Sequence, residues 1–256
     1  MPSAGLMTRG GLPRQALPHP ALGILVRRMI EDAIRLAWHR LRTENPSRRI
    51  NLSTAGEVKC TARLVKLLNK LRDAPDESLK GFSSSMFQVV ARGGEVESFD
   101  GKHLEKRPDM VFRLIQPRPG IASSEYDGLF VECKVVDVTH SLSAYCKHGL
   151  RRFVSGEYAW AMREALMVAY VRGGWTVNKG LAKHLKKHES TYAITAALAP
   201  RVGEGAAKPQ VLVSAHARTW TYPSGSLPGV IEVAHLWLDA EKKSDKARTK
   251  KKAQTS

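Results

Sequence analysis

The sequence has few cysteines and lacks the long apolar runs of a membrane protein. Its three cysteines, Cys60, Cys133 and Cys146, are an odd number without a CxxC pair, so they can form neither a disulfide framework nor a four-thiolate metal cluster within one chain. No run approaches the roughly 20 apolar residues of a membrane helix. The N-terminus has glycines and prolines where a secretory signal would be apolar. We therefore expect a cytoplasmic protein that does not enter a membrane.

Acidic side chains are also scarce relative to basic ones. The chain has 24 Asp and Glu against 41 Lys and Arg, a formal net charge of +17. The excess is concentrated at the two ends, because residues 1–50 contribute +6 and residues 241–256 contribute +5. Such a charge attracts polyanions before any specific contact forms. Nucleic acid is therefore the first partner to expect, and the basic ends should add affinity without selecting sequence.

The remaining composition suits one folded domain with appendages. The chain has 256 residues, of which 43% are hydrophobic, enough for a full core. We expect a flexible basic arm over 1–20, a helix packed on the core within 21–50, the main domain over 51–240 and a disordered basic tail over 241–256. No internal repeat is present.

Periodicity and turn residues predict an α/β fold with a mixed central sheet flanked by helices and an added N-terminal helix. The predicted helices are one over 21–43, a second opening near residue 54, a long one over 143–172 closed by two glycines, and a short basic one over 178–188. The predicted strands are 86–91, 109–115, 128–136, 191–198, 210–217 and 230–238.

The start of the second helix has the spacing of a capping box. Thr54 is followed three positions later by Glu57, ahead of an apolar stripe at helical spacing. The spacing predicts that the two residues satisfy each other's backbone N–H groups.

Three charged residues stand out on two adjacent predicted strands. Side chains alternate along a strand, so Glu132 and Lys134 share one face, and Asp109 lies on the polar side of the preceding strand. If the two strands pair, Asp109 and Glu132 are neighbours. Two neighbouring carboxylates repel each other unless a cation lies between them. Mg²⁺, with Mn²⁺ as a possible substitute, is commonly bound by one or two carboxylates plus substrate phosphate oxygens.

The segments Pro108-Asp109 and Glu132-Cys133-Lys134 resemble the signature of the PD-(D/E)XK nuclease superfamily, the restriction-endonuclease-like fold. The resemblance implies a core of helix, three strands, helix and strand across about residues 53–198. It also implies that Asp109 and Glu132 bind Mg²⁺, that the backbone carbonyl of Cys133 completes the ligands, and that Lys134 acts on the attacking water. An acidic residue on the first core helix, here Glu57, joins the site in many members. Host defence and DNA repair are the roles that this family suggests.

The three-residue pattern ExK is not specific by itself, because it occurs three times in the chain. What favours Asp109 and Glu132 is their place in alternating β-like runs, which other matches lack. The alternative is that Asp109, Glu132 and Lys134 form an ordinary ion pair between two solvent-facing strands. For Glu57 the alternative is a purely structural role as a helix cap.

Five further residues are candidates for nucleic-acid contact. The predicted long helix carries Tyr145, Arg151 and Arg152, and the helix after the ExK strand usually flanks the cleft in this fold. His216 and Arg218 share the polar face of a predicted strand. A solvated basic helix face and an outward-facing strand explain the same patterns without function.

The leading hypothesis is a Mg²⁺-dependent nuclease that hydrolyses phosphodiester bonds, with DNA as the first expected substrate. The alternative is a noncatalytic nucleic-acid-binding subunit of a larger complex that uses the same fold. An RNA-directed enzyme would carry the same metal site, because the motif reports phosphodiester chemistry and not the sugar. A homodimer or a protein partner is compatible with either hypothesis.

Overall fold

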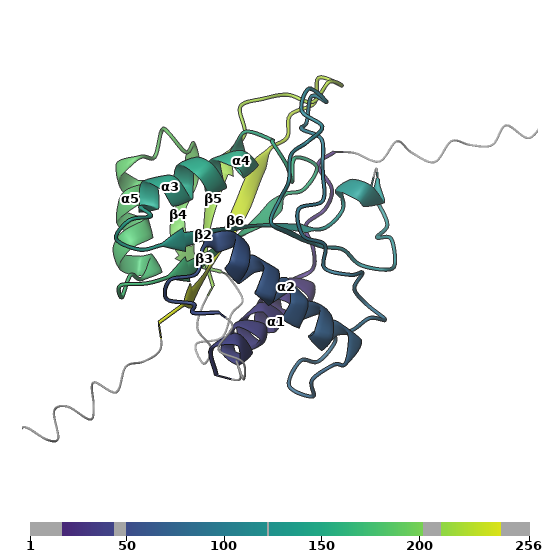
Figure 1. Cartoon of the computed structure of the whole chain (residues 1–256). Coiled ribbons are helices and arrows are strands. Elements are labelled where there is room, and N and C mark those ends of the chain that lie inside the picture. The colour runs from purple at the N-terminus through teal and green to yellow at the C-terminus, as the bar shows by residue number, and fades with distance from the viewer. Residues whose placement is uncertain (1–16, 44–49, 122, 202–210, 242–256) are drawn as a thin grey trace, which may run out of the picture.

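The chain folds around one mixed six-stranded sheet (Figure 1). The computed structural model describes residues 17–43, 50–121, 123–201 and 211–241. Its helices are α1 (Ile24–Thr43), α2 (Glu57–Asp73), η1 (Ser124–Tyr126), α3 (Leu142–Tyr145), η2 (Cys146–Leu150), α4 (Arg151–Val154), η3 (Val177–Leu181) and α5 (Ala182–Lys187). Its strands are β1 (Met110–Phe112), β2 (Leu129–Val136), β3 (Glu164–Val171), β4 (Ile194–Pro200), β5 (Leu212–Ala217) and β6 (Val230–Asp239).

The strand order is β1-β2-β3-β6-β5-β4, with β2, β3 and β6 parallel and the other neighbours antiparallel. β3 lies near the middle of the sheet, and all eight of its residues are buried. The register places Glu132, Met167 and His235 side by side on β2, β3 and β6, so their side chains share one face of the sheet. The neighbouring residues of each strand face the other side.

Helices cover both faces of the sheet. On one face lie α1 and α2, where Trp38 stacks on Tyr170 at a centroid distance of 4.9 Å and Thr61 Oγ1 lies 3.0 Å from the Tyr170 hydroxyl. On the other face lies the segment from α3 to α4, where the Tyr145 hydroxyl is 2.9 Å from His235 Nδ1. Figure 1 shows these two helical layers on opposite sides of the strands.

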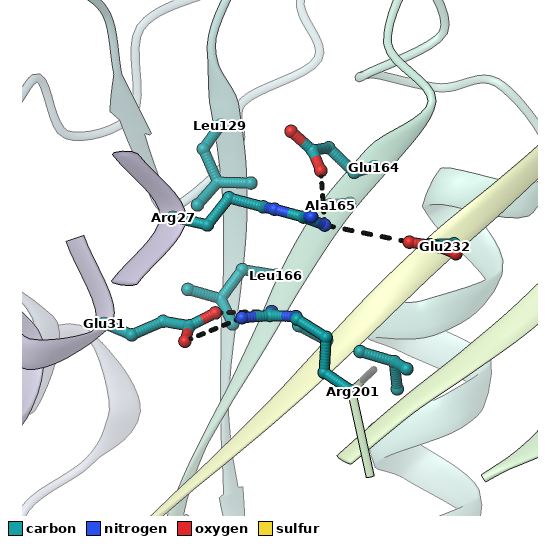
Figure 2. Close-up of a pocket in the computed structure, with 10 residues that line it drawn as sticks. Arg27, Glu31, Leu129, Glu164, Ala165, Leu166, Arg201 and Glu232 are labelled. Carbon is teal, nitrogen blue, oxygen red and sulfur yellow. Dashed lines mark hydrogen bonds and ion pairs between the residues drawn. The ribbon is translucent and has the colours of Figure 1, made fainter. Parts of the chain in front are cut away.

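Buried ion pairs attach α1 to the sheet (Figure 2). Glu31 accepts hydrogen bonds from the Arg201 guanidinium at 2.6 and 3.0 Å, and both side chains are buried. Arg27 Nη1 lies 2.8 Å from Glu164 Oε2 at the start of β3 and 3.7 Å from the exposed Glu232 carboxylate. Removing a charge from water is unfavourable, so the loss of one partner leaves the other charge buried and unpaired and destabilises the fold.

We expect Glu31→Gln to lower the free energy of unfolding by about 3 kcal/mol, because it removes a two-point ion pair from a buried guanidinium. Urea titration measures this loss, with the slope of the transition unchanged. Glu232→Gln is the matched control, because that carboxylate is exposed and should contribute less than about 1 kcal/mol. Equal effects of the two substitutions would contradict the role assigned to the Glu31–Arg201 pair.

Most predicted elements are present. The predictions of an α/β fold and of a mixed sheet flanked by helices are confirmed, as is the added N-terminal helix, which is α1. The strands predicted over 109–115, 128–136, 191–198, 210–217 and 230–238 correspond to β1, β2, β4, β5 and β6, and the short basic helix predicted over 178–188 corresponds to η3 and α5.

The prediction of one long helix over 143–172 is wrong. That segment forms the short helices α3, η2 and α4, then a turn, and then the central strand β3. Gly156 and Ala159 in the turn have φ values of 74° and 55°, a left-handed conformation that ends a right-handed helix.

Two smaller predictions need correction. The capping box at Thr54 does not form, because α2 begins at Glu57 after Gly56, and no side chain caps its N-terminus. Residues 86–91 do not form a regular strand, although Phe87 and Ala91 make isolated bridges to Leu114 and Val111.

The two ends of the chain lie mostly outside the described residues. These are residues 1–16 of the expected arm and 242–256 of the expected tail. The last residues of the arm pack on the domain, because His19 is buried and its backbone N–H donates to the Ala161 carbonyl at 2.6 Å. Within the part of the chain that the structure describes, no helix has the length and apolar character that crossing a membrane requires.

Candidate active site

The predicted carboxylate pair lies where β1 begins beside β2. The antiparallel register pairs Met110 with Val131, so Asp109, the residue before Met110, lies opposite Glu132. The backbone N–H of Cys133 donates to Asp109 Oδ2 at 2.7 Å, which fixes the Asp109 carboxylate against β2. Burial raises the pKa of Asp109, and burial raises the pKa of Glu132 to about 7. The two groups therefore form a desolvated acidic site that favours a nearby cation.

The ammonium of Lys134 supplies that cation in this structure. Lys134 Nζ lies 2.7 Å from Glu132 Oε1 and 3.0 Å from Glu57 Oε1, and it donates to the Cys133 carbonyl at 3.0 Å. Burial disfavours its charge, but the carboxylates of Glu132 and Glu57 outweigh that effect and raise the pKa of Lys134. Three oxygens from β2 and α2 thus converge on one positive nitrogen.

Two residues absent from the predicted metal site also contact the Glu132 carboxylate. The Tyr158 hydroxyl donates to Glu132 Oε2, and Arg152 Nη1 lies 3.3 Å from Glu132 Oε1. Arg152 Nη1 also donates to the Tyr158 hydroxyl at 3.5 Å. Burial and the Glu132 carboxylate raise the pKa of Tyr158 well above its ordinary value, so the hydroxyl keeps its proton and remains a donor.

The local backbone explains how Tyr158 reaches Glu132. The turn between α4 and β3 has positive φ at Gly156 and Ala159, which reverses the chain and returns Tyr158 to the sheet. Phe153 packs edge-on against the Tyr158 ring at 5.3 Å, and Tyr158 is fully buried. The sequence predicts packing for Tyr158, and no spacing rule connects a residue in this turn to Glu132.

A glycine lets the helical segment pass directly over the site. A Cβ at Gly149, in η2, would lie 2.5 Å from Met167 Cε and 3.5 Å from Glu132 Cγ. Real Cβ contacts do not reach 2.5 Å, so only glycine fits here without moving Met167. This close approach keeps Glu132 covered and only 1% exposed.

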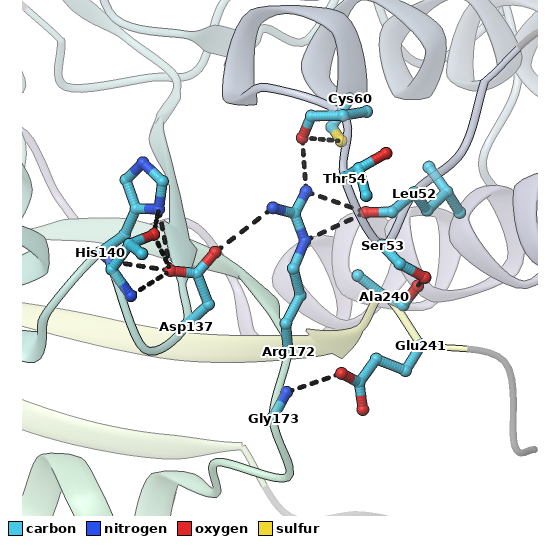
Figure 3. Close-up of polar contacts among 12 residues, drawn as sticks. Leu52, Ser53, Thr54, Cys60, Asp137, His140, Arg172, Gly173, Ala240 and Glu241 are labelled. Atoms are coloured by element: carbon cyan, nitrogen blue, oxygen red, sulfur yellow. Dashed lines mark hydrogen bonds and ion pairs between the residues drawn. The ribbon is translucent and has the colours of Figure 1, made fainter.

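Arg172 fixes the start of α2 and thereby the position of Glu57 (Figure 3). Its guanidinium donates to the Leu52 carbonyl at 2.9 and 3.1 Å and also to the Ala55 carbonyl. Arg172 Nη1 further lies 3.3 Å from Asp137 Oδ2, just beyond the end of β2. One side chain at the end of β3 therefore ties the turn before Glu57 to the strand that carries Glu132 and Lys134.

The structure brings only one of the five candidate nucleic-acid contacts into this site. That residue is Arg152, and Arg151 is exposed beside it on α4. Tyr145, His216 and Arg218 lie in the interior, where a nucleic acid cannot reach them in this conformation. Each has an internal partner instead, because polar groups removed from water need hydrogen bonds.

Hydrogen bonds inside the protein satisfy the polar groups of Tyr145, His216 and Arg218. Arg218 donates to the carbonyls of Trp160 and Met162, both at 3.0 Å. Tyr145 and His216 belong to a chain of buried hydrogen bonds between β5, β6 and α3. The polar face of β5 therefore points inward, and we do not retain these three residues as surface contacts.

The donor atoms suit a hard divalent cation. The buried carboxylate of Glu132, the half-buried carboxylate of Asp109 and a backbone carbonyl are oxygen ligands of the kind that Mg²⁺ prefers. Mg²⁺ also keeps several waters rather than demanding a full protein cage. Among the residues that the structure describes, no three His, Cys, Asp or Glu side chains are grouped so that they could hold a metal ion by themselves. Asp109, Glu132 and the Cys133 carbonyl would thus hold Mg²⁺ with water and substrate oxygens.

Comparisons with protein families, with curated proteins and with solved structures found no match to this chain.

Proposed function

We propose that this protein is a Mg²⁺-dependent nuclease that hydrolyses phosphodiester bonds in DNA. The observation that carries the proposal is the convergence of Glu132 Oε1, Glu57 Oε1 and the Cys133 carbonyl on one cationic nitrogen, beside the anchored carboxylate of Asp109. A chance ion pair on two solvent-facing strands would not bury Glu132 or gather oxygens from α2 and β2 about one point.

The residues of the site have distinct roles in this proposal. Asp109, Glu132 and the Cys133 carbonyl would hold Mg²⁺, which when bound lowers the pKa of a water and neutralises phosphate charge. Lys134 is a cation here, so it donates to the water or to the phosphate rather than removing a proton. The water oxygen bonds to phosphorus as the bond to the leaving sugar oxygen breaks. The water releases one proton and the leaving oxygen takes one, so no further reagent is needed.

The order of elements supports the restriction-endonuclease-like fold. Helix α2, the bridging residues 86–91, β1, β2, the helical segment α3–α4 and β3 follow one another over residues 57–171. This order resembles the helix, three strands, helix and strand that the resemblance implies, except that residues 86–91 make only isolated bridges in place of a regular first strand. It spans fewer residues than the 53–198 predicted from the sequence. The net charge of +17 supports a polyanionic substrate.

A digest of several nucleic acids by the full chain tests the proposal. Linear duplex, circular duplex, single-stranded DNA and RNA are incubated with Mg²⁺, Mn²⁺, Ca²⁺ or EDTA. We expect cleavage of DNA with Mg²⁺ or Mn²⁺, and weaker turnover with Ca²⁺, whose larger and less strictly octahedral coordination misplaces the water. Undiminished cleavage in excess EDTA would overturn the metal mechanism.

One observation favours the noncatalytic alternative. Glu132 already contacts Lys134, Arg152 and Tyr158, so its negative charge is compensated without a metal. A nucleic-acid-binding subunit could retain such a site as a structural element. Calorimetric titration with Mg²⁺ separates the hypotheses, because the nuclease requires binding that Asp109→Ala abolishes, whereas the noncatalytic subunit requires none.

We expect Tyr158→Phe to reduce cleavage about 10- to 100-fold, the range typical when a residue that orients a metal ligand is lost. The substitution removes only the hydroxyl that holds Glu132 Oε2. The Mg²⁺ concentration for half-maximal cleavage should rise, and this measurement distinguishes positioning from a general loss of fold.

Tyr222→Phe is the matched control for this prediction. Tyr222 is also buried, and its hydroxyl donates to the Trp160 carbonyl at 2.7 Å, away from Glu132. Both variants should lose similar thermal stability, but only Tyr158→Phe should change the Mg²⁺ dependence. An unchanged Mg²⁺ dependence in Tyr158→Phe would show that Tyr158 is only a packing residue.

A further inference from the structure

The outward face of α2 carries a stripe of four exposed cations, which we call the α2 stripe: Lys59, Arg63, Lys66 and Lys70. Their spacing of three or four residues aligns them on one side of a helix. The opposite side of α2 packs into the core through Cys60, Thr61, Leu64, Val65, Leu68 and Leu71. The stripe is therefore held on a fixed helix rather than on a loop.

Few acidic residues accompany the α2 stripe on its own helix. The helix has no acidic residue between Glu57 and Asp73, and none of the four cations forms an ion pair within the described ranges. Like charges three or four residues apart destabilise a helix by about 0.2–0.5 kcal/mol per pair. Helix stability therefore does not explain this arrangement, whereas attraction of an external polyanion does.

The location of the stripe connects it to the candidate active site. Helix α2 begins at Glu57, whose carboxylate contacts Lys134, and the stripe starts two residues later on the opposite side of the same helix. A helix is about 10 Å wide and rises about 1.5 Å per residue. The first residue of the stripe, Lys59, thus lies within about 10 Å of Glu57, and the stripe extends away from it for about 16 Å.

We infer that the α2 stripe binds the sugar–phosphate backbone of duplex DNA on one side of the cleavage site. The identity of this DNA as a substrate rests on the proposed function, but the binding surface does not need the metal. Lysine and arginine that contact phosphates position a duplex without reading its sequence. The stripe should therefore contribute equally to affinity for unrelated sequences.

Salt dependence of binding tests the inference. The full chain and the variant K59Q/R63Q/K66Q are titrated onto a labelled 30-base-pair duplex in EDTA, so that cleavage does not interfere. Glutamine keeps a helix propensity close to that of lysine and arginine, and circular dichroism checks the fold. Because each neutralised phosphate contributes about 0.9 to the slope of log affinity against log salt, we expect a slope shallower by about 2 to 3.

Helix α5 offers a control with the same change of charge. Lys183, Lys186 and Lys187 are also exposed, but α5 covers the other face of the sheet from α2 (Figure 1). The variant K183Q/K186Q/K187Q should shift the slope by less than about one.

Three results would overturn the inference: no binding of the duplex by the unmodified chain, no change of slope in the α2 variant, or equal changes in the two variants. Failure of the proposed function is a separate result. In that case the unmodified chain does not cleave DNA with Mg²⁺, although the α2 variant still shows the shallower slope.

Discussion

Glu132→Gln should reduce DNA cleavage by more than about 1000-fold while the fold remains intact. The substitution preserves the shape of the side chain but removes the charge that the proposed metal needs and a partner of Lys134, so charge stabilisation and water activation are both lost. Asp109→Asn and Lys134→Ala should have effects of the same order. Single-turnover cleavage rates and circular dichroism measure activity and fold independently.

Two variants serve as comparisons for this prediction. Glu95→Gln alters an exposed carboxylate that pairs with Arg107, so it should leave cleavage unchanged. Glu57→Gln distinguishes two roles: a site residue loses activity, whereas a structural residue loses stability and keeps activity. Full cleavage by any two of the variants at Asp109, Glu132 and Lys134 would show that the active site lies elsewhere.

The central residues of the site could be predicted because strand alternation is a simple rule. One register between β1 and β2 is enough to place Asp109 beside Glu132, and the alternation along β2 places Lys134 on the same face as Glu132. The contact of Glu57 with Lys134 required the tertiary arrangement of α2, which Arg172 fixes from the end of β3. The capping-box spacing predicts that Glu57 helps to cap α2, but no side chain caps this helix in the structure.

The strand β3 and the contact of Tyr158 with Glu132 could not be predicted, because β3 lacks the alternation that identifies β1 and β2. Residues Glu164–Val171 are buried on both faces, so the strand is continuously apolar and shows no alternation. Alanine, leucine and methionine in this run also favour helix in isolation. The helix predicted over 143–172 runs through Gly156 and Ala159, so that prediction omits the turn that directs Tyr158 to Glu132.

A chain of buried hydrogen bonds on the face of the sheet that α3 and α4 cover makes the fold sensitive to acid. His216 Nδ1 lies 2.7 Å from the Tyr192 carbonyl, so it is the donor, and Nε2 of a neutral His216 accepts from Ser214. Ser214 Oγ then accepts from His235 Nε2, and His235 Nδ1 accepts from the Tyr145 hydroxyl. Both histidines are neutral in this arrangement, and a proton on either one would place a charge in the interior without a carboxylate partner in this network, which burial disfavours.

We therefore expect the free energy of unfolding to fall steeply as the pH drops below about 6.5, the ordinary pKa of histidine. Burial lowers the pKa of His235 to about 3 and lowers the pKa of His216 as well. Between the folded and unfolded pKa values, the unfolded chain binds a proton that the folded chain does not. Each such histidine then contributes a loss of about 1.4 kcal/mol per pH unit.

Urea titrations at pH 7.5, 6.0 and 5.0 measure this loss, and His235→Gln identifies its source. Glutamine keeps one donor and one acceptor but does not titrate, so the variant should lose about 1.4 kcal/mol per pH unit of the dependence, even if it is less stable at pH 7.5. His103→Gln is the control, because His103 is exposed and should leave the pH dependence unchanged. If His235→Gln retains the full pH dependence of the unmodified protein, the acid sensitivity arises from other groups and the neutral network is not its cause.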